Sequence, residues 1–539
     1  MIAAGPPGPQ CSNGLSPLPR PRNRGSEMLR SFWSICLVQS LLSLILCDVL
    51  PAAEQPNIVL IYVDDLGYGD LGCTGGAAVS TPNIDRLADE GCRFTDGHSA
   101  AATCTPSRYA LLTGEYAWRR KGTGIATGDA ASIIAADRVT LASILRRAGY
   151  RSAVVGKWHL GLGTADLDWN RPISPAPLDL GFDESFIIPA TGDRVPCVYV
   201  EGRQVVGLDP ADPIQVSFSG PIGTEPTGLQ NPELLKLQWE HGHNATIVNG
   251  ISRIGFMTGG HKARWVDEDM ADVLTARAQK FIEQHVSSHH RQPFFLFFST
   301  HDVHVPRVPH PRFAGRSALG ARGDVLEQLD WSVGQLLKTL EQHQLSRNTL
   351  VILTSDNGPV LNDGYRDEAA ERNGKHRPSG PFRGGKYSAF EGGTRVPMLV
   401  RWPARIPPRS TSDALICQVD FLATFAALTG ESLPQGCGPD SRNLLPALLL
   451  EDRHGREHLV QQAGTLSVRQ GRWKLIESSK GPALNRQVNI ETGNLGKPQL
   501  YDLAADPGET QNLADSQPTR VIELQKLLDK VRAESSSGR

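Results

Sequence analysis

One short segment, Cys104-Thr105-Pro106-Ser107-Arg108, carries the side chains with the clearest potential for chemistry. Pro106 lacks a backbone N–H and its ring presets φ for the first turn of a helix, so Cys104 is expected at or just before a helix N-terminus. Free N–H groups and the helix dipole favour an anion at that end. Arg108, four residues further on, can fold back over the same end. The spacing indicates a cysteine beside an anion-binding position; a buried structural cysteine is the alternative.

A second group of polar residues follows two apolar runs that are typical of buried parallel strands. Asp64-Asp65 comes directly after the run IVLIYV, and Asp356-Asn357 comes just after the run TLVILT. In open α/β sheets ligands bind beyond the carboxyl ends of the strands, so these four side chains are expected to meet. Their ligand atoms are oxygens, which favours Ca²⁺ or Mg²⁺ over Zn²⁺. Helix caps and turns are the alternative interpretation of each pair.

Basic residues follow two further candidate strands. Lys157 and His159 come after the run SAVV, and His301 and His304 come after the run FFLFFS. Lys386 precedes the run PMLVR, so its own loop must carry it to the same edge of the sheet. A lone His or Lys is commonly a surface residue. His301 is the alternative to His304 as the histidine of the site. Charged side chains at several separate strand ends nevertheless indicate one common site.

Two segments resemble the signatures of type I, formylglycine-dependent sulfatases, and of their arylsulfatase-A-like members in particular. They are the run from Cys104 to Gly114 (CTPSRYALLTG) and the run from Gly149 to His159 (GYRSAVVGKWH). In that family the cysteine is oxidised to formylglycine by a formylglycine-generating enzyme. One hydroxyl of the hydrated aldehyde attacks sulfur and expels the alcohol, and the other then loses its proton so that sulfate leaves. A serine in place of the converted cysteine has no second hydroxyl on the same carbon, so it would stay trapped as its sulfate ester.

The resemblance also implies a role for each remaining candidate. The cation would be one calcium ion per chain, with Mg²⁺ the weaker choice, and its ligands would be Asp64, Asp65, Cys104, Asp356 and Asn357. The catalytic set would be Cys104, Arg108, Lys157, His159, His304 and Lys386. Within this set the two lysines would contact the sulfate group. His159 would hydrogen-bond the formylglycine hydroxyl, and His304 would contact the leaving oxygen.

Parts of the region 190–325, such as Thr191-Gly192-Asp193-Arg194 and His241-Gly242-His243-Asn244, resemble bacterial enzymes that act on sulfated carbohydrates. The implied function is a sulfuric ester hydrolase for an aryl sulfate or a sulfated carbohydrate, with a galactosamine-6-sulfate type of substrate as the specific expectation. Two alternatives stay open. One is a phosphodiesterase or phosphonate hydrolase of the alkaline phosphatase superfamily. The other is a non-catalytic protein that binds sulfated glycans and keeps Cys104 as a thiol.

Short apolar runs alternate with helical patterns, which is typical of an α/β fold with a mostly parallel sheet sandwiched by helices. The resemblance implies the alkaline-phosphatase-like version of this fold. We expect a catalytic domain over residues 55–429, with helices near 81–90, 141–148, 269–285 and 325–342 and with insertions over one sheet edge at 160–260. Residues 430–539 are expected to form a smaller C-terminal subdomain, with an antiparallel pair over 466–476 and a last helix over 519–533.

The composition is that of an ordinary globular chain. The 539 residues include 40% apolar residues and carry a formal net charge of -2, which argues against binding to nucleic acid or to a membrane surface. No long apolar run follows the N-terminus, so no integral membrane association of the mature chain is expected. Residues 1–53 are interpreted as an N-terminal extension and signal peptide, with Met28 preferred over Met1 as the start. The protein is therefore expected to be exported, to the periplasm or the medium.

Cysteine usage adds one further expectation. Nine cysteines fall to six once residues 1–53 are removed, and their spacing predicts neither a disulfide framework nor a zinc site. Cys73 with Cys92, or Cys417 with Cys437, are the pairs that an oxidising compartment could join.

Overall fold

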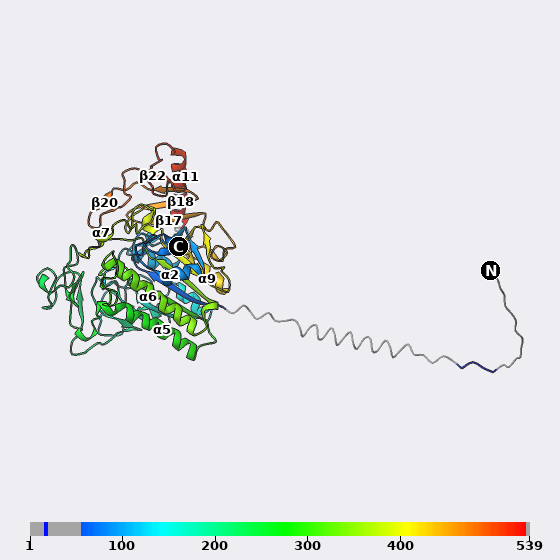
Figure 1. Ribbon diagram of the computed structural model, residues 1–539, viewed down its shortest axis with the longest axis horizontal. Coiled ribbons are helices and arrows are strands. Elements are labelled where there is room, and N and C mark those ends of the chain that lie inside the picture. The colour runs from blue at the N-terminus through cyan, green and yellow to red at the C-terminus, as the bar shows by residue number, and fades with distance from the viewer. Residues whose placement is uncertain (1–15, 20–54, 535–539) are drawn as a thin grey trace, which may run out of the picture. The chain divides into compact units, whose positions relative to one another are not determined.

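The computed structural model describes residues 16–19 and 55–534 (Figure 1). The described residues from 55 to 534 belong to one compact unit of the chain. The expected signal peptide, and the choice between Met1 and Met28, lie outside the described residues. Within the described residues, no helix combines the length and apolar character that crossing a membrane requires.

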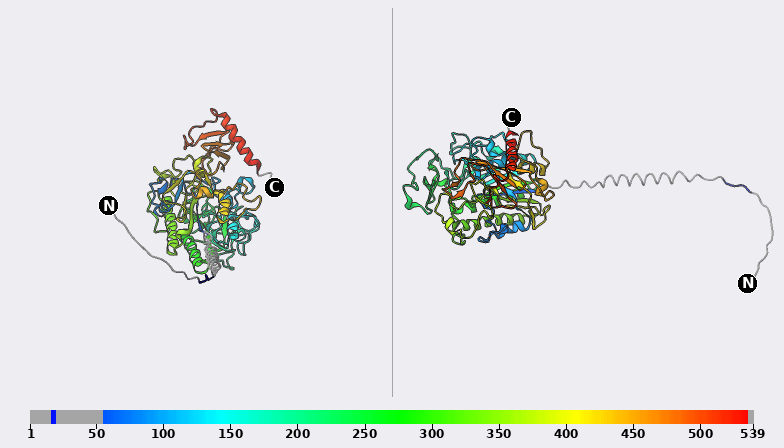
Figure 2. Two further views of the ribbon diagram at one scale, coloured as in Figure 1. Left: turned by 90° about the vertical axis from the view of Figure 1, so that its right-hand side faces the viewer. Right: turned by 90° about the horizontal axis from the view of Figure 1, so that it is seen from above.

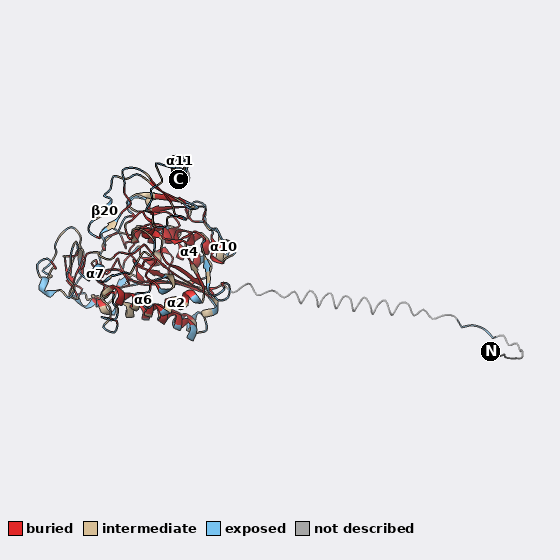
Figure 3. Cartoon of the chain, turned by 45° about the horizontal axis from the view of Figure 1, so that its top comes forward, coloured by how far each residue is buried: buried red, intermediate tan, exposed pale blue. Residues whose placement is uncertain are grey.

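A ten-stranded sheet forms the centre, in the order β15-β2-β14-β13-β1-β12-β4-β5-β6-β7. Its five middle strands run parallel: β13 (Thr349–Ser355), β1 (Asn57–Val63), β12 (Phe294–Ser299), β4 (Arg151–Lys157) and β5 (Glu184–Ile188). Strand β1 lies between β12 and β13, with Ile58 opposite both Phe295 and Leu350. These strands are almost continuously apolar because both of their faces are covered. Figure 3 shows buried residues concentrated in the interior of the folded part of the chain.

The outer strands depart from the parallel pattern. On one side, β14 (Met398–Arg401) pairs antiparallel with both β13 and β2 (Cys92–Phe94), and β15 (Ser410–Ser412) completes that edge. On the other side, β6 (Val200–Glu201) and β7 (Gln204–Val205) pair antiparallel beyond β5. The expectation of insertions over one sheet edge at 160–260 needs a correction, because β5, β6 and β7 of this region extend the sheet itself.

Helices cover both faces of the sheet. One layer contains α2 (Pro82–Asp89), α5 (Met270–Ser288) and α6 (Ala321–Gln342), and α5 and α6 lie side by side in Figure 1. The other layer contains α3 (Cys104–Thr113), α4 (Leu141–Arg147) and α9 (Phe421–Thr429). Side-chain alternation on β12 accounts for the two layers, since Phe294 packs on Phe281 of α5 while Phe297 packs on Tyr62, which lies under Arg108 of α3. The expected helices are confirmed with small changes in their ends.

Shorter elements connect these layers. They are α7 (Ala369–Arg372), α8 (Glu391–Thr394), α10 (Leu445–Leu448) and the strand pairs β3 (Gly97–His98) with β16 (Ile416–Cys417), β8 (Gln215–Ser217) with β11 (Phe256–Thr258), and β9 (Ile247–Val248) with β10 (Ile251–Ser252). The six cysteines among the described residues are all free thiols, so neither candidate disulfide forms here.

The C-terminal part is a four-stranded antiparallel sheet with one long helix. Its strands are β17 (His458–Gln462), β18 (Leu466–Gln470), β19 (Trp473–Ile476) and β22 (Gln499–Asp502), and its helix is α11 (Pro518–Glu534). The helix, red in Figure 2, packs Leu524 and Leu528 against this sheet. A small hairpin, β20 (Leu484–Asn485) and β21 (Ile490–Glu491), projects from the loop before β22. The expected antiparallel pair and last helix are confirmed; a domain boundary at residue 429 stays a prediction.

Candidate active site

Helix α3 begins at Cys104 itself. Thr103 precedes it in an extended conformation, and every residue of the helix is buried, so its N-terminus lies inside the protein. The helix ends at Thr113 and is capped by Gly114, whose φ of 64° is left-handed and where an added Cβ would lie 2.8 Å from a Leu422 side-chain carbon. Only glycine meets both demands without strain. Cys104 is 2% exposed and lines a pocket of about 270 Å³.

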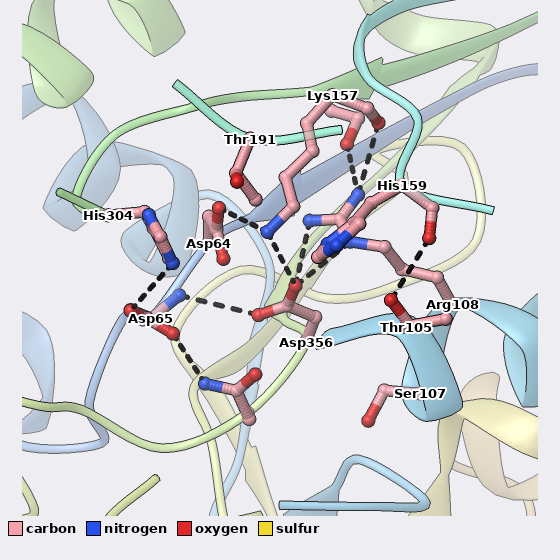
Figure 4. A network of polar contacts seen from close by, with 12 residues as sticks. Asp64, Asp65, Thr105, Ser107, Arg108, Lys157, His159, Thr191, His304 and Asp356 are labelled. Atoms are coloured by element: carbon pink, nitrogen blue, oxygen red, sulfur yellow. Dashed lines mark hydrogen bonds and ion pairs between the residues drawn. The ribbon is translucent and has the colours of Figure 1, made fainter. Parts of the chain in front are cut away.

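The carboxyl ends of β1 and β13 bring the acidic residues together beside α3. One carboxylate oxygen from each of Asp64, Asp65 and Asp356 lies within 4.8 Å of the others. Asn357 donates from Nδ2 to Asp65 Oδ1 at 2.7 Å, so it belongs to the same cluster. Asp65 has a left-handed φ of 60°, and its backbone N–H donates to Asp356 Oδ1 at 3.3 Å (Figure 4). All four residues that the sequence grouped are therefore neighbours.

Three cationic side chains surround these carboxylates. Lys157 Nζ lies 2.5 Å from Asp64 Oδ2 and 3.8 Å from Asp356 Oδ2. Arg108 Nη2 lies 2.8 Å from Asp356 Oδ2, so the guanidinium points into the carboxylate cluster (Figure 4). Lys386 Nζ donates to Asp65 Oδ2 at 2.8 Å. All three cations are buried, so their ion pairs must offset the large free-energy cost of removing these charges from water.

Burial and pairing set opposite protonation tendencies within the cluster. Burial raises the pKa of Asp64 well above its ordinary value, although Lys157 opposes the shift. Burial acts in the same direction on Asp356, but Arg108 and Lys157 together hold its pKa below the ordinary value. Lys386 also bonds Asp363 at 2.9 Å, so four carboxylates face three cations. The cluster carries one excess negative charge when all of its groups are ionised.

The donor set fits a hard divalent cation. Asp64 Oδ1 and Asn357 Oδ1 are buried oxygens without a hydrogen-bond partner, and an unsatisfied buried acceptor is costly. Both belong to the oxygen-rich cluster of Asp65 and Asp356, and carboxylate and amide oxygens are the ligands that Ca²⁺ and Mg²⁺ prefer. A divalent cation would satisfy these oxygens and reverse the excess charge of the cluster.

His159 is oriented by α3. Its Nε2 lies 2.9 Å from the carbonyl oxygen of Ala126, while its buried Nδ1 has no partner. Thr105 of α3 links His159 to Ala126. Its hydroxyl donates to the His159 backbone carbonyl at 3.1 Å and accepts from the Ala126 N–H at 3.2 Å. His159 also has a left-handed φ of 55°. Burial, with Lys157 nearby, holds the pKa of His159 well below its ordinary value.

The two rival histidines occupy different cavities. His304 lines the pocket of Cys104, with its Nδ1 2.7 Å from the Val305 carbonyl oxygen and its Nε2 3.8 Å from Asp65 Oδ2. His301 lines a separate cavity of about 20 Å³ that is also lined by Asp302. Burial lowers the pKa of His301 to about 4. Of the pair, only His304 lines the pocket of Cys104, although one ligand atom from each of His301, His304 and Asp64 lies within 4.8 Å of the others.

The pocket contains residues that the sequence did not single out as a site. Asp363 bonds Lys386, and Tyr387 lines the wall with a left-handed φ of 73°. The hairpin β20–β21 contributes Asn485, Gln487 and Val488. An Asp-Gly turn at 363–364 was the only signal for Asp363. Nothing in the hairpin sequence distinguishes it from an ordinary surface loop.

A polar wall completes the pocket. Asp193 Oδ2 lies 3.0 Å from His243 Nε2, and Arg194 Nη1 lies 2.8 Å from Asp193 Oδ1. The sequence predicts that the segments carrying these residues resemble those of enzymes acting on sulfated carbohydrates, but it assigns no role to Asp193, Arg194 or His243. The wall presents fixed donors and acceptors, which suits a hydroxyl-rich ligand.

Comparison with known proteins agrees with this geometry. A family model described as Sulfatase matches residues 56–431, and one described as N-sulphoglucosamine sulphohydrolase, C-terminal, matches residues 385–535. An N-acetylgalactosamine-6-O-sulfatase of Bacteroides thetaiotaomicron is 53% identical over 89% of this chain and 94% of its own length. Human arylsulfatase A is 33% identical over 88% of this chain and 86% of its own. A solved structure from B. thetaiotaomicron, described under the metabolism of multiple glycosaminoglycans, matches with a TM-score of 0.87 and 53% identity, covering 89% of this chain and 100% of that one. The expected family and fold are confirmed: this chain belongs to the sulfatase family and is a sulfuric ester hydrolase.

Proposed function

We propose that this enzyme removes a 6-O-sulfate from an N-acetylgalactosamine-type sugar, with formylglycine at position 104 and one calcium ion. The observation that carries the proposal is the position of Cys104, the first residue of α3, in a pocket shared with Lys386 and His304. The carboxylate cluster of Asp64, Asp65 and Asp356 supplies the cation site. Once converted and hydrated, residue 104 would offer the hydroxyl that attacks sulfur.

The sulfate group would lie among cationic side chains that the fold fixes in advance. Lys157 and Lys386 are both buried and both held by carboxylates, so they need little reorganisation when an anion arrives. Calcium, held by Asp64, Asp65, Asp356 and Asn357 together with the converted residue 104, would polarise the sulfate as a Lewis acid. Arg108 fixes Asp356 and thereby keeps the ligand set in place.

The two histidines would handle protons at different oxygens. His304 presents Nε2 to the pocket because Nδ1 is hydrogen-bonded to the Val305 carbonyl, and we assign it to the leaving oxygen of the alcohol. Thr105, the residue after Cys104, donates its hydroxyl to the His159 backbone carbonyl. We assign the Nδ1 atom of His159, which has no hydrogen-bond partner, to the hydroxyl of the converted residue 104. General acid–base assistance of this kind typically contributes ~10²–10⁴-fold to the rate.

The substrate assignment rests on the polar wall and on the 53% identical relative, whose name states N-acetylgalactosamine-6-O-sulfatase. Asp193 and His243 can hydrogen-bond sugar hydroxyls, and Arg194 holds Asp193 in place. We further propose that the enzyme is exported and that a formylglycine-generating enzyme converts Cys104 before folding completes, because the folded protein buries this residue.

The decisive experiment is a panel of sulfated monosaccharides with the purified enzyme, its formylglycine content verified by peptide mass mapping. N-acetylgalactosamine-6-sulfate should be hydrolysed far faster than the 4-sulfate or than glucosamine-6-sulfate. A clear preference for another position or sugar would reject the substrate assignment. Phosphate diesters and phosphonates serve as a second panel, and faster turnover of these would support the phosphohydrolase alternative. Sugar binding without turnover by fully converted protein would support the glycan-binding alternative.

A further inference from the structure

Lys386 lies in the loop 383–392, whose two ends, here called its base, are joined to each other. Gly392 donates from its backbone N–H to the Arg383 carbonyl at 2.8 Å, which joins the two ends of the loop. Near the tip, the Lys386 N–H donates to the Pro359 carbonyl and the Tyr387 N–H donates to the Ala102 carbonyl. The tip therefore contacts the active site, two residues before Cys104, while the base faces the C-terminal sheet.

One residue of the C-terminal part contacts both ends of this loop. The Glu509 carbonyl accepts from Arg383 Nη1 at 2.8 Å, and the Glu509 carboxylate accepts from the Glu391 N–H. The Glu391 side chain is held in turn by Lys474 of β19, whose Nζ lies 3.0 Å from Glu391 Oε1 and 3.1 Å from Glu509 Oε1. None of these three side chains is exposed.

This cluster takes no part in the chemistry described above, although it is costly to maintain. Placing the Lys474 ammonium between two buried carboxyl groups removes charge from water, and deleting one member of such a set is strongly destabilising. Arg395 and Arg469 lie 3.2 and 3.6 Å from Glu391 Oε2, so the cluster joins α8 to both β18 and β19. Its contacts converge on the base of one loop.

We propose that Lys474, Glu391 and Glu509 are positioning residues for Lys386, so that the C-terminal sheet sets how tightly the active site holds the sulfate group. Lys474 fixes Glu391 and Glu509, these fix the base of the loop, and the loop fixes Lys386 Nζ beside Asp65 and Asp363. The inference rests on the proposed function, because it takes Lys386 to be a sulfate ligand.

The test measures binding of inorganic sulfate by calorimetry in full-length, metal-loaded enzyme. Lys474→Met keeps the length of the side chain and removes the charge, and it should weaken sulfate binding about tenfold or more. Lys474→Arg keeps a cation at the same place and should restore most of the affinity. Lys497→Met is the matched control, since it removes an exposed ion pair with Asp515 in the same part of the chain and should leave sulfate binding unchanged.

A double-mutant cycle with Lys386→Ala separates positioning from general loosening of the fold. If Lys474 acts through Lys386, adding Lys474→Met to Lys386→Ala should cause no further loss of sulfate affinity. Equal losses in the two backgrounds would overturn the inference and leave the proposed function intact. Normal sulfate binding by Lys386→Ala would overturn the sulfate-binding role of Lys386, and the inference with it. Glu391→Gln is the second variant and should follow the same pattern if Lys474→Met does not fold.

Discussion

Replacing Glu509 by Gln should remove one component of the pH dependence of stability. Burial raises the pKa of this carboxyl from an ordinary 4.5 to about 7, with Lys474 opposing the shift and Glu391 adding to it. The folded protein then binds the proton more tightly than the unfolded chain does. The stabilisation is fully present below about pH 4.5 and is lost as the pH rises through about 7. A shift of this size corresponds to about 3 kcal/mol of unfolding free energy.

The assay is urea unfolding of wild type and Glu509→Gln at several pH values between about 4 and 8. The difference in unfolding free energy should change by up to about 3 kcal/mol across this range, in favour of the variant at high pH. The groups that face Glu509 remain in both proteins: Lys474, Glu391, Arg469, Arg383 and Tyr501. Any constant cost of the substitution shifts the curve without changing its slope. A difference that stays flat with pH would show that Glu509 does not titrate in this range, and would refute the reasoning.

Three further predictions concern the reaction itself. Cys104→Ala should abolish turnover without a change in the far-ultraviolet circular dichroism spectrum, and active wild-type protein that carries only a free thiol at 104 by peptide mapping would contradict the proposed nucleophile. Exhaustive chelation should inactivate the enzyme, and Ca²⁺ should restore activity better than Zn²⁺. Asp356→Ala should lower both the amount of bound metal and the rate by orders of magnitude. Full activity in a metal-free sample would contradict the proposed cation site. His304→Ala should slow hydrolysis of a sulfated sugar by ~10²–10⁴-fold and of 4-nitrophenyl sulfate much less, because a sugar alcohol is the poorer leaving group. Equal losses on both substrates would instead make His304 a general sulfate ligand and would leave His301 as the acid to test.

The sequence predicts those residues of the candidate site whose place depends on their position at the end of a strand. Asp64 and Asp356 follow apolar runs that are typical of buried parallel strands, and the carboxyl ends of such strands meet at one edge. The antiparallel pairing of β14 was not predictable, because a four-residue apolar run carries no signal for direction. The strands β5 to β7 were missed since they are short and lie in a region rich in Pro and Gly. The hairpin that brings Gln487 to the pocket was missed for another reason: its position depends on contacts with a loop about 100 residues earlier in sequence.

Three residues of the site, Asp65, His159 and Tyr387, have left-handed backbones that non-glycine residues seldom adopt. Conformations of this kind cost on the order of 1–3 kcal/mol each, and the surrounding fold must supply that energy. A glycine at position 387 would relieve this backbone strain at once. The same change would delete a pocket wall and free the backbone beside Lys386. Selection for thermal tolerance and selection for turnover oppose each other at this position, so a useful library must screen for both.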